Sequence, residues 1–390
     1  MERQILTNAR IVTPTSNFIG SLIIENGIIA EIIQDKFYRE GNNLNEQWLM
    51  PGIIDIHTDY LEKEVNPRPT ASFPLSFALH YLDARAASCG LTTVFCAISF
   101  SDDPMKDRSL SDAIQFVKDF DKIKYNLLIR HYLHARLDPN TNAVLAYLDE
   151  MKTLESLYLI VYNENIPGQR QFKLDNLIER WIIRKEKSRE EIIVEINEKI
   201  ERLSQINHRP EIFASFNNKF VIGSHDDTTT DHVIEAKKYG AILSEMPTTI
   251  EAARKAKELD MWVCMGAPNY YRGGSHCGNL SCFEAMDENL VDILCSDYHF
   301  PALLGSVVKM IQEGVSPSKA ISYVTNNPAK MLKFNDVGSI EIGKKADLIT
   351  FSIIESHAAV SNVYIEGVQK YTTNYKETIK NNKQFLQVTY

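Results

Sequence analysis

The feature that most constrains the fold is a regular alternation of short apolar runs with helical patterns between Pro51 and about Phe334. Runs rich in β-branched residues predict strands, and segments with apolar residues at helical spacing predict helices. Strands that alternate with helices form a parallel sheet, and eight repeats over about 280 residues match the size of a (β/α)8 barrel of the TIM type. The eight predicted strands are Gly52–His57, Thr92–Ile98, Leu127–Arg136, Leu157–Asn163, Phe220–His225, Ala241–Glu245, Met261–Gly266 and Val291–Asp297.

The two ends of the chain are β-rich and differ from the middle. Gln4–Val12 and Ser21–Ile33 are apolar and β-branched, and Asn26-Gly27 inside the second run predicts a hairpin turn. Gly338–Phe351 and the residues after it repeat this composition. We therefore predict a small β-sandwich domain built from residues 1–50 and 335–390, beside a barrel of residues 51–334.

One insertion before the fifth strand is longer than a barrel needs. Asn176–Leu203 is charged and helical, and Ser188 with Glu191 forms a capping-box pattern. Its apolar face is predicted to hold Ile193, Ile196, Ile200 and Leu203. We interpret the segment as a solvated helix pair on the barrel exterior. The alternative is a lid or an oligomer contact, which keeps a homodimer among the predicted partners.

The composition excludes several classes of protein. The net charge is -9, from 42 basic and 51 acidic residues, and there is no basic block of the kind that nucleic-acid binding needs. An acidic chain that binds an anionic substrate needs a local cluster of basic residues or a metal ion. The six cysteines form no Cys-x-x-Cys pair, and from the sequence we expect neither a signal peptide nor a membrane-spanning segment. We expect a cytoplasmic protein with reduced thiols and no membrane partner.

Metal-ligand residues follow most of the predicted barrel strands. Function in such barrels gathers at the carboxyl ends of the strands. Imidazoles and carboxylates that meet there are typical ligands of zinc or manganese. The residues at the strand ends are Asp55, His57 and Asp59 at the first strand, His134, Arg136 and Asp138 at the third, Asn163, Glu164 and Asn165 at the fourth, His225, Asp226 and Asp227 at the fifth, Glu245 at the sixth and Asp297 at the eighth.

Nine segments that span nearly the whole chain carry a family resemblance, in the order LMPGIIDIHTDYLEKEVNPRPTASFP, GLTTVFCAISFSDD, PGQRQF, SHDDTT, EMPTTIEAA, MGAPNYYRGGSHCGN, SDYHFPALL, VTNNPAK and GSIEIGKKADLITF. They resemble one branch of the amidohydrolase superfamily, the α-D-ribose 1-methylphosphonate 5-triphosphate diphosphatases of the carbon–phosphorus lyase pathway. The EKE and PRP segments of the first run, and the RGGSH segment with the GN that follows it, are specific to this branch.

The resemblance implies a (β/α)8 barrel with a small sheet domain and a centre of one or two divalent ions, zinc or manganese. It implies that a metal-activated water attacks the α-phosphorus of a ribose 1-alkylphosphonate 5-triphosphate. Diphosphate then leaves, and the 5-phosphate remains. His57 and Asp59 match the metal ligands of the first strand, and His225 matches that of the fifth. Asp297 matches the carboxylate that ligates metal and accepts the proton of water, so His225 and Asp297 are the predicted catalytic residues.

The same resemblance places a phosphate-binding set in the loops at the barrel mouth. Planar guanidinium groups suit bidentate contacts to phosphate, and a chain of negative net charge needs such a cluster. Gln169 is expected to reach the ribose. The predicted substrate-binding residues are Lys63, Arg68, Gln169, Arg170, Arg272, Ser275 and His276.

Two positions depart from the branch. Relatives have Asp-His before the Pro-Gly-Gln run, where this chain has Glu164 and Asn165, and their third-strand Glu is Asp138 here. An amide is a poorer ligand for a transition metal than imidazole, so the second metal position is predicted to be weak. Glu164 and Asp138 nevertheless complete the predicted ligand set.

Two other functions stay open. The first is an amidohydrolase that cuts a C–N bond in a cyclic amide or deaminates a base, which would share the metal centre but not need the basic loops. The second is a weakly active or non-catalytic paralogue, suggested by Asn165 alone.

Overall fold

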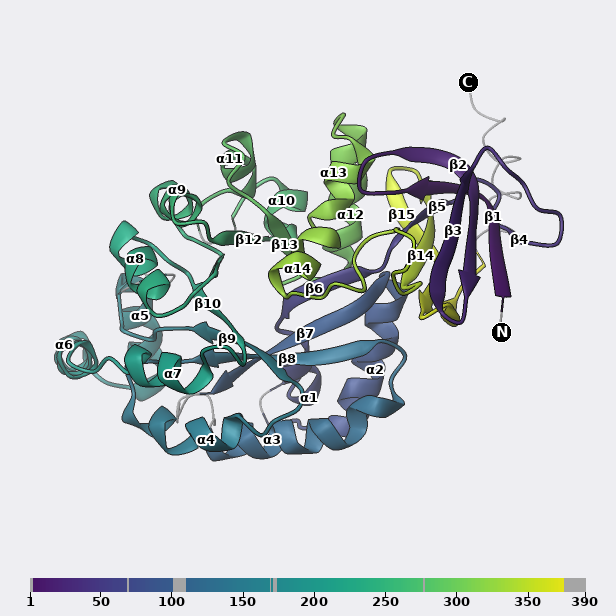
Figure 1. Ribbon diagram of the computed structural model, residues 1–390. Coiled ribbons are helices and arrows are strands. Elements are labelled where there is room, and N and C mark those ends of the chain that lie inside the picture. The colour runs from purple at the N-terminus through teal and green to yellow at the C-terminus, as the bar shows by residue number, and fades with distance from the viewer. Residues whose placement is uncertain are drawn as a thin grey trace, which may run out of the picture.

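Two eight-stranded sheets organise the computed structural model, which describes residues 3–68, 70–100, 110–168, 170, 174–275 and 278–374 (Figure 1). The first sheet is parallel throughout, and each neighbour along it is the next strand in the chain. All eight predicted barrel strands are present, with ends that differ by a few residues. Their bounds are β6 (Ile53–Thr58), β7 (Leu91–Phe100), β8 (Arg130–Leu137), β9 (Leu157–Tyr162), β10 (Val221–His225), β11 (Leu243–Glu245), β12 (Trp262–Gly266) and β13 (Ile293–Cys295).

The barrel closes where its first and last strands meet. The amide of Asp59 donates to the carbonyl of Asp297 at 2.7 Å, and the amide of Asp297 donates to the carbonyl of His57 at 3.0 Å. Closure therefore joins the two chain segments that carry predicted metal ligands, and it fixes their backbones against each other.

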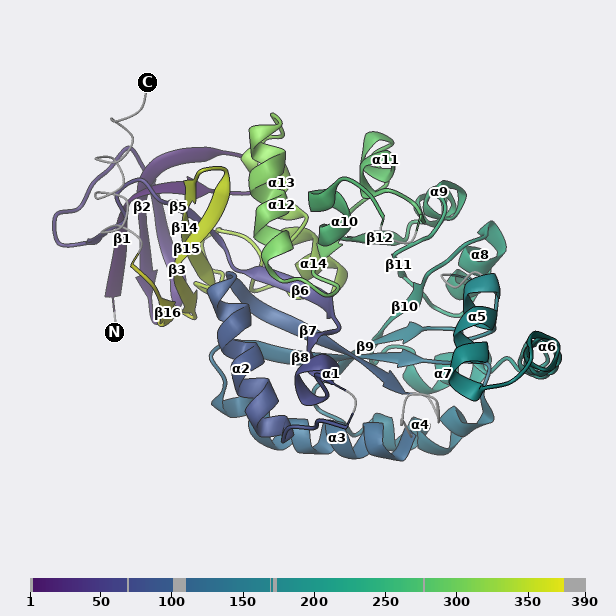
Figure 2. The same ribbon diagram turned by 180° about the vertical axis from the view of Figure 1, so that it is seen from behind.

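Helices follow the strands and surround the sheet, as Figures 1 and 2 show. Apolar side chains of the helices and of the outer strand faces form the largest core, while Phe95, Leu159 and Cys264 belong to a second core inside the barrel. The helices are α1 (Tyr60–Val65), α2 (Leu75–Ser88), α3 (Leu110–Ile123), α4 (Leu148–Met151), α5 (Leu174–Lys185), α6 (Arg189–Ser204), α7 (Arg209–Phe216), α8 (Thr230–Lys238), α9 (Ile250–Glu258), α10 (Ala267–Arg272), α11 (Cys282–Asp287), α12 (Pro301–Gln312), α13 (Pro317–Ser322) and α14 (Asn326–Met331), with short 3-10 turns at Lys124–Asn126 and Asn142–Tyr147. None of the helices in the described ranges has the length and apolar character needed to cross a bilayer.

The second sheet combines strands from both ends of the chain, as predicted. Its path is β16 (Val368–Thr372), β15 (His357–Ile365), β14 (Leu348–Ile354), β5 (Trp48–Pro51), β1 (Arg3–Val12), β2 (Asn17–Glu25) and β3 (Ile28–Gln34), with β4 (Asn42–Asn43) beside β1. The pairs are antiparallel except where β1 meets β4 and β5. The predicted turn at Asn26 and Gly27 joins β2 to β3, and both residues have positive φ, which an Asn-Gly hairpin turn requires.

The second sheet folds over a core of its own. The amide of Ile29 donates to the carbonyl of Lys344, and the amide of Ala346 donates to the carbonyl of Gly27, both at 2.8 Å. These bonds join the start of β3, the last strand of the path, to the segment that leads into β14. The sheet thereby encloses apolar residues such as Ile11 and Leu348. Strand β15 contacts α2 and α12, which attaches this sheet to the barrel.

The charged insertion forms α5 and α6, at the opposite side of the barrel from the second sheet (Figures 1 and 2). The capping box of Ser188 and Glu191 is confirmed. The predicted apolar face is wrong at one position, because Ile192 is buried against α5 while Ile193 is exposed. Ile192 and Ile196 are one helical turn apart, and together they face Ile178 of α5. The lid and homodimer alternatives stay predictions.

Candidate metal centre and active site

The carboxyl ends of five barrel strands bring imidazoles and carboxylates together. His57 and Asp59 follow β6, and His134 lies in β8. His225 ends β10 directly beside Glu245, which ends β11. Asp297 follows β13 and lies against the end of β6. Because the strands are parallel, all these ends share one mouth of the barrel.

The first group that fits a metal ion consists of His57, His134 and Glu245. One ligand atom from each lies within 4.8 Å of the others, and all three residues are buried. Nε2 of His134 and Oε1 of Glu245 make no hydrogen bond to any described residue. Buried polar atoms that converge without partners are costly unless something binds them. Two imidazoles and a carboxylate are the donor set that zinc or manganese takes.

The second group consists of His57, Asp59 and Asp297, whose ligand atoms also lie within 4.8 Å of one another. Nε2 of His57 is 3.5 Å from Oδ1 of Asp59. Nδ1 of His57 is 3.0 Å from Oε2 of Glu245. One ring nitrogen of His57, Nδ1, therefore faces the first group, and the other, Nε2, faces the second. Nη1 of Arg136 lies 3.1 Å from Oδ1 of Asp59 and brings a fixed positive charge to the second group.

Three ligand side chains, His134, Glu245 and Asp59, have the charge states that metal binding needs, while the carboxylate of Glu245 raises the pKa of His57 above its ordinary value against the opposing effect of burial. Burial lowers the pKa of His134 to about 3, against the opposing charge of Glu245, so its imidazole is neutral. Burial raises the pKa of Glu245, but the charge of His57 and the hydrogen bonds from the rings of His57 and His225 outweigh burial and hold the pKa well below its usual range. Burial also raises the pKa of Asp59, yet the guanidinium of Arg136 lowers it overall. Neutral imidazole and ionised carboxylate are the forms that ligate metals.

Asp297 and His225 lie at the same mouth, as predicted. Burial raises the pKa of Asp297 above its ordinary value. Nδ1 of His225 is 2.9 Å from Oε2 of Glu245, and its ring stacks on that of His57 with centroids 5.5 Å apart. Neither ligand group includes His225, so its role as a ligand stays a prediction.

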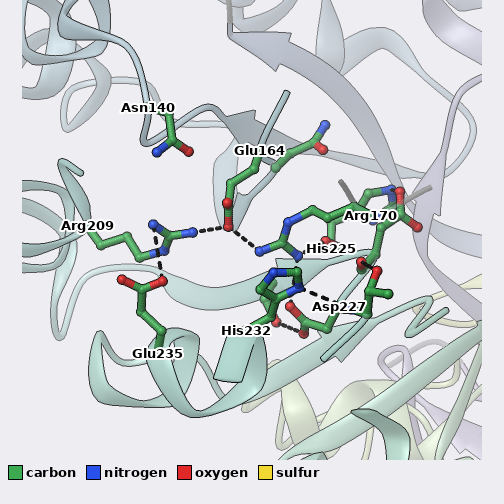
Figure 3. Close-up of polar contacts among 12 residues, drawn as sticks. Asn140, Glu164, Arg170, Arg209, His225, Asp227, His232 and Glu235 are labelled. Atoms are coloured by element: carbon green, nitrogen blue, oxygen red, sulfur yellow. Dashed lines mark hydrogen bonds and ion pairs between the residues drawn. The ribbon is translucent and has the colours of Figure 1, made fainter. Parts of the chain in front are cut away.

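Glu164 lies in a buried ion-pair network, which Figure 3 shows. It belongs to neither ligand group. Oε1 of Glu164 accepts hydrogen bonds from Nη2 of Arg170 and from Nη2 of Arg209. Nη1 of Arg170 also donates to the carbonyl of His225 at 2.7 Å and to Oδ1 of Asp227 at 2.9 Å. Arg170, predicted to bind phosphate, thus has a side chain only 4% exposed that supports the end of β10.

Asp138 also lies outside both ligand groups. Its Oδ1 accepts from the amide of Asn140 at 2.9 Å, and its Oδ2 accepts from Nδ2 of Asn165 at 3.1 Å. The two departures from the branch therefore contact each other. The structure does not bring Asp138 or Glu164 to the ligand groups, and their assignment as metal ligands stays a prediction.

Two of the predicted phosphate-binding residues lie at the side chain of Tyr298, the residue that follows Asp297 in the chain. Nη1 of Arg272 donates to the hydroxyl of Tyr298 at 3.2 Å, and Nζ of Lys63 lies 5.9 Å from the centre of the same ring. Both basic side chains are exposed, and Lys63 is close enough to act on the pKa values of Asp59 and Asp297.

The other predicted substrate-binding residues are less informative. Arg68 is exposed and makes a backbone bridge to Ala71. Ser275 accepts from the amide of Asn279 at 3.2 Å, in the loop after α10. Gln169 and His276 lie outside the described residues.

Sequence reasoning gave no role to three residues at the centre of the site, His134, Arg136 and Glu245. All three lie at or near the end of a predicted strand, and this position is the feature of the sequence that indicates a place in the site. His134 and Arg136 are two apart in β8, so they share the face that points into the barrel. Only the register of the neighbouring strands shows that this face meets His57 and Asp59.

Comparisons with known proteins agree with this geometry. The model of the amidohydrolase family matches residues 274–370. The α-D-ribose 1-methylphosphonate 5-triphosphate diphosphatase of Escherichia coli strain K12 is 31% identical over 376 residues, which cover 93% of this chain and 99% of that protein.

Solved structures share the fold at low identity. The N-acetylglucosamine-6-phosphate deacetylase of Pasteurella multocida aligns with a TM-score of 0.65 and 13% identity, over 95% of this chain and 100% of that one. The dihydropyrimidinase of Brevibacillus agri aligns with a TM-score of 0.60 and 13% identity, over 94% of this chain and 95% of that one. From its sequence identity to the diphosphatase over almost the whole of both proteins, the chain belongs to the amidohydrolase family, as a relative of that enzyme.

Proposed function

We propose that this protein hydrolyses an α-D-ribose 1-alkylphosphonate 5-triphosphate to the 5-phosphate and diphosphate, as a cytoplasmic step of phosphonate catabolism. Support comes from the identity to the E. coli diphosphatase over 93% of the chain. The structural observation that carries the proposal is the position of Lys63 and Arg272. Both basic side chains meet at Tyr298, one residue after Asp297, where a phosphorylated substrate would reach the ligand groups.

The residues that would hold a divalent ion, zinc or manganese, are those of the two ligand groups. Such an ion would supply positive charge that stabilises the developing charge on phosphoryl oxygens and helps to ionise water. The protein contributes the fixed positions. Glu245 orients His225 through Nδ1, and barrel closure holds the backbone of Asp297 to those of His57 and Asp59.

Asp297 is the proposed general base. Its carboxylate lies at the mouth and accepts the proton of the attacking water. The water oxygen forms a bond to the α-phosphorus, and the bond from that phosphorus to the oxygen bridging to the β-phosphate breaks. The released diphosphate takes the electron pair of the broken bond.

Lys63 and Arg272 are proposed to bind the phosphate chain. They offer charged N–H donors on an exposed rim of a chain that is acidic overall. Hydrogen bonds between charged groups and phosphate are about twice as strong as neutral ones. A hydrolase of cyclic amides would not need this pair of cations, so the geometry favours the phosphorylated substrate.

The experiment is a phosphorus NMR assay with ribose 1-methylphosphonate 5-triphosphate as the probe. We expect diphosphate and the ribose 5-phosphate product from the wild type, and a loss of rate in Asp297→Asn. Asp287→Asn, an exposed carboxylate on α11, is the matched control and should keep full activity. Release of orthophosphate in place of diphosphate, or turnover of a cyclic amide with no phosphorus product, would contradict the proposal.

A further inference from the structure

We propose that the guanidinium of Arg136 takes the place of a second metal cation, so that the centre binds one divalent ion per chain. This inference rests on the proposed metal centre but not on the identity of the substrate. It concerns the number of divalent ions that the site binds. Neither the kinds of ligand atom in the site nor the similarity to a diphosphatase determines that number.

The position of Arg136 is the first argument. It lies two residues after His134 in β8, and its side chain is only 12% exposed. Nη1 lies 3.1 Å from Oδ1 of Asp59, and Nη2 lies 3.9 Å from Oε2 of Glu62. A guanidinium stays protonated in proteins, so this positive charge is permanent.

The second argument is that the two ligand groups share His57. A neutral imidazole has one nitrogen with a free lone pair and one that carries a proton, so it ligates one ion. When the buried group with His134 and Glu245 takes His57, the other group keeps only the carboxylates of Asp59 and Asp297. The two groups are therefore not both complete at once.

The third argument is charge. Without a cation, the carboxylates of Asp59 and Asp297 would repel each other at the barrel mouth. Arg136 supplies one positive charge in contact with Asp59, and Lys63 adds a second nearby. A second divalent ion at Asp59 would sit close to the guanidinium and be repelled by it. The favourable arrangement is one metal ion in the first ligand group, of His57, His134 and Glu245, and the guanidinium of Arg136 beside Asp59.

The test counts bound manganese in the intact protein. Mn²⁺ suits the carboxylate oxygens that the second position offers. Wild type, Arg136→Gln and Arg136→Lys are titrated with Mn²⁺ by calorimetry, and metal content is checked by elemental analysis. We expect one tight equivalent in the wild type and in Arg136→Lys, which keeps the positive charge. In Arg136→Gln we expect a second equivalent that binds at least tenfold more tightly than any weak binding to the wild type.

Each outcome decides the proposal. Two equivalents of comparable affinity in the wild type would overturn it, and this measurement does not depend on the folding of any variant. One equivalent in a folded Arg136→Gln would overturn it too, with thermal unfolding as the check of folding. If none of the three proteins binds metal, the proposed metal centre itself fails. If they bind as expected but release no diphosphate from the triphosphate probe, only the proposed substrate fails.

Discussion

Nδ1 of His225 lies 2.9 Å from Oε2 of Glu245, and both side chains are buried at the ends of neighbouring strands. The same Oε2 lies 3.0 Å from Nδ1 of His57. One carboxylate therefore faces two parallel imidazole rings. A carboxylate in this position fixes the orientation of a ring, which otherwise rotates freely enough to weaken a metal site.

The substitution Glu245→Gln should weaken metal binding. The amide keeps the shape of the side chain but removes its negative charge, both as a ligand and as a partner for His57 and His225. We expect affinity for zinc or manganese to fall about 10- to 100-fold. The measurement is a competition titration with a chelating dye, and Glu258→Gln, an exposed carboxylate on α9, is the control. Equal affinities in all three proteins would exclude Glu245 from the centre.

Removal of metal should lower the thermal stability of the wild type. Without an ion, the ligand groups leave buried atoms such as Nε2 of His134 without a partner. A ligand at a hundredfold excess over its Kd stabilises the folded state by about 2.7 kcal/mol. Thermal unfolding after dialysis against a chelator should show a lower Tm that recovers when Zn²⁺ or Mn²⁺ is added. A Tm that does not respond to either metal would argue against a built site.

The sequence predicts the barrel well because apolar runs alternate regularly with helical patterns between Pro51 and about Phe334. Its parallel order then places His57, Asp59, His225 and Asp297 at one mouth without further information. The order of the strands does not predict the partners of Glu164. Arg209 lies 45 residues further along the chain, in α7, and the insertion of α5 and α6 separates it from Glu164 in the sequence. Spacing along the chain contains no signal for that contact.

The first ligand group, of His57, His134 and Glu245, is hard to predict for a different reason. Glu245 ends a strand of three residues, too short for the alternation of buried and exposed positions to show which way its side chain points. The pairing of β11 with β10 settles this direction. The sequence places Arg136 at a strand end and indicates no role for it, because a guanidinium among predicted metal ligands cannot be told from a surface ion pair until its burial is known.

Glu164→Ala should destabilise the protein without removing the metal. The substitution would leave two buried guanidinium groups, Arg170 and Arg209, without their shared carboxylate. Removal of one partner from a buried ion pair costs about 3–5 kcal/mol. Urea unfolding measures this loss. Glu235→Ala, which removes a more exposed partner of Arg209, should cost less than about 1 kcal/mol. A variant that keeps its stability but loses metal would place Glu164 in the metal centre instead.

Arg272→Ala should weaken the use of a phosphorylated substrate with little effect on stability. Arg272 is exposed, and its guanidinium donates a hydrogen bond to Tyr298, the residue that follows Asp297. A hydrogen bond to a charged group contributes about 1.5–3 kcal/mol, so kcat/KM should fall roughly tenfold to a hundredfold.

The control for Arg272→Ala is Arg254→Ala, because Arg254 is also exposed but pairs with Glu288 away from the barrel mouth. Kinetics with ribose 1-methylphosphonate 5-triphosphate at two salt concentrations give a second check. Since salt screens an exposed charge, the difference between wild type and Arg272→Ala should shrink at the higher concentration. An equal kcat/KM for wild type and Arg272→Ala at low salt would remove Arg272 from the phosphate-binding set and leave Lys63 as the basic residue to test next.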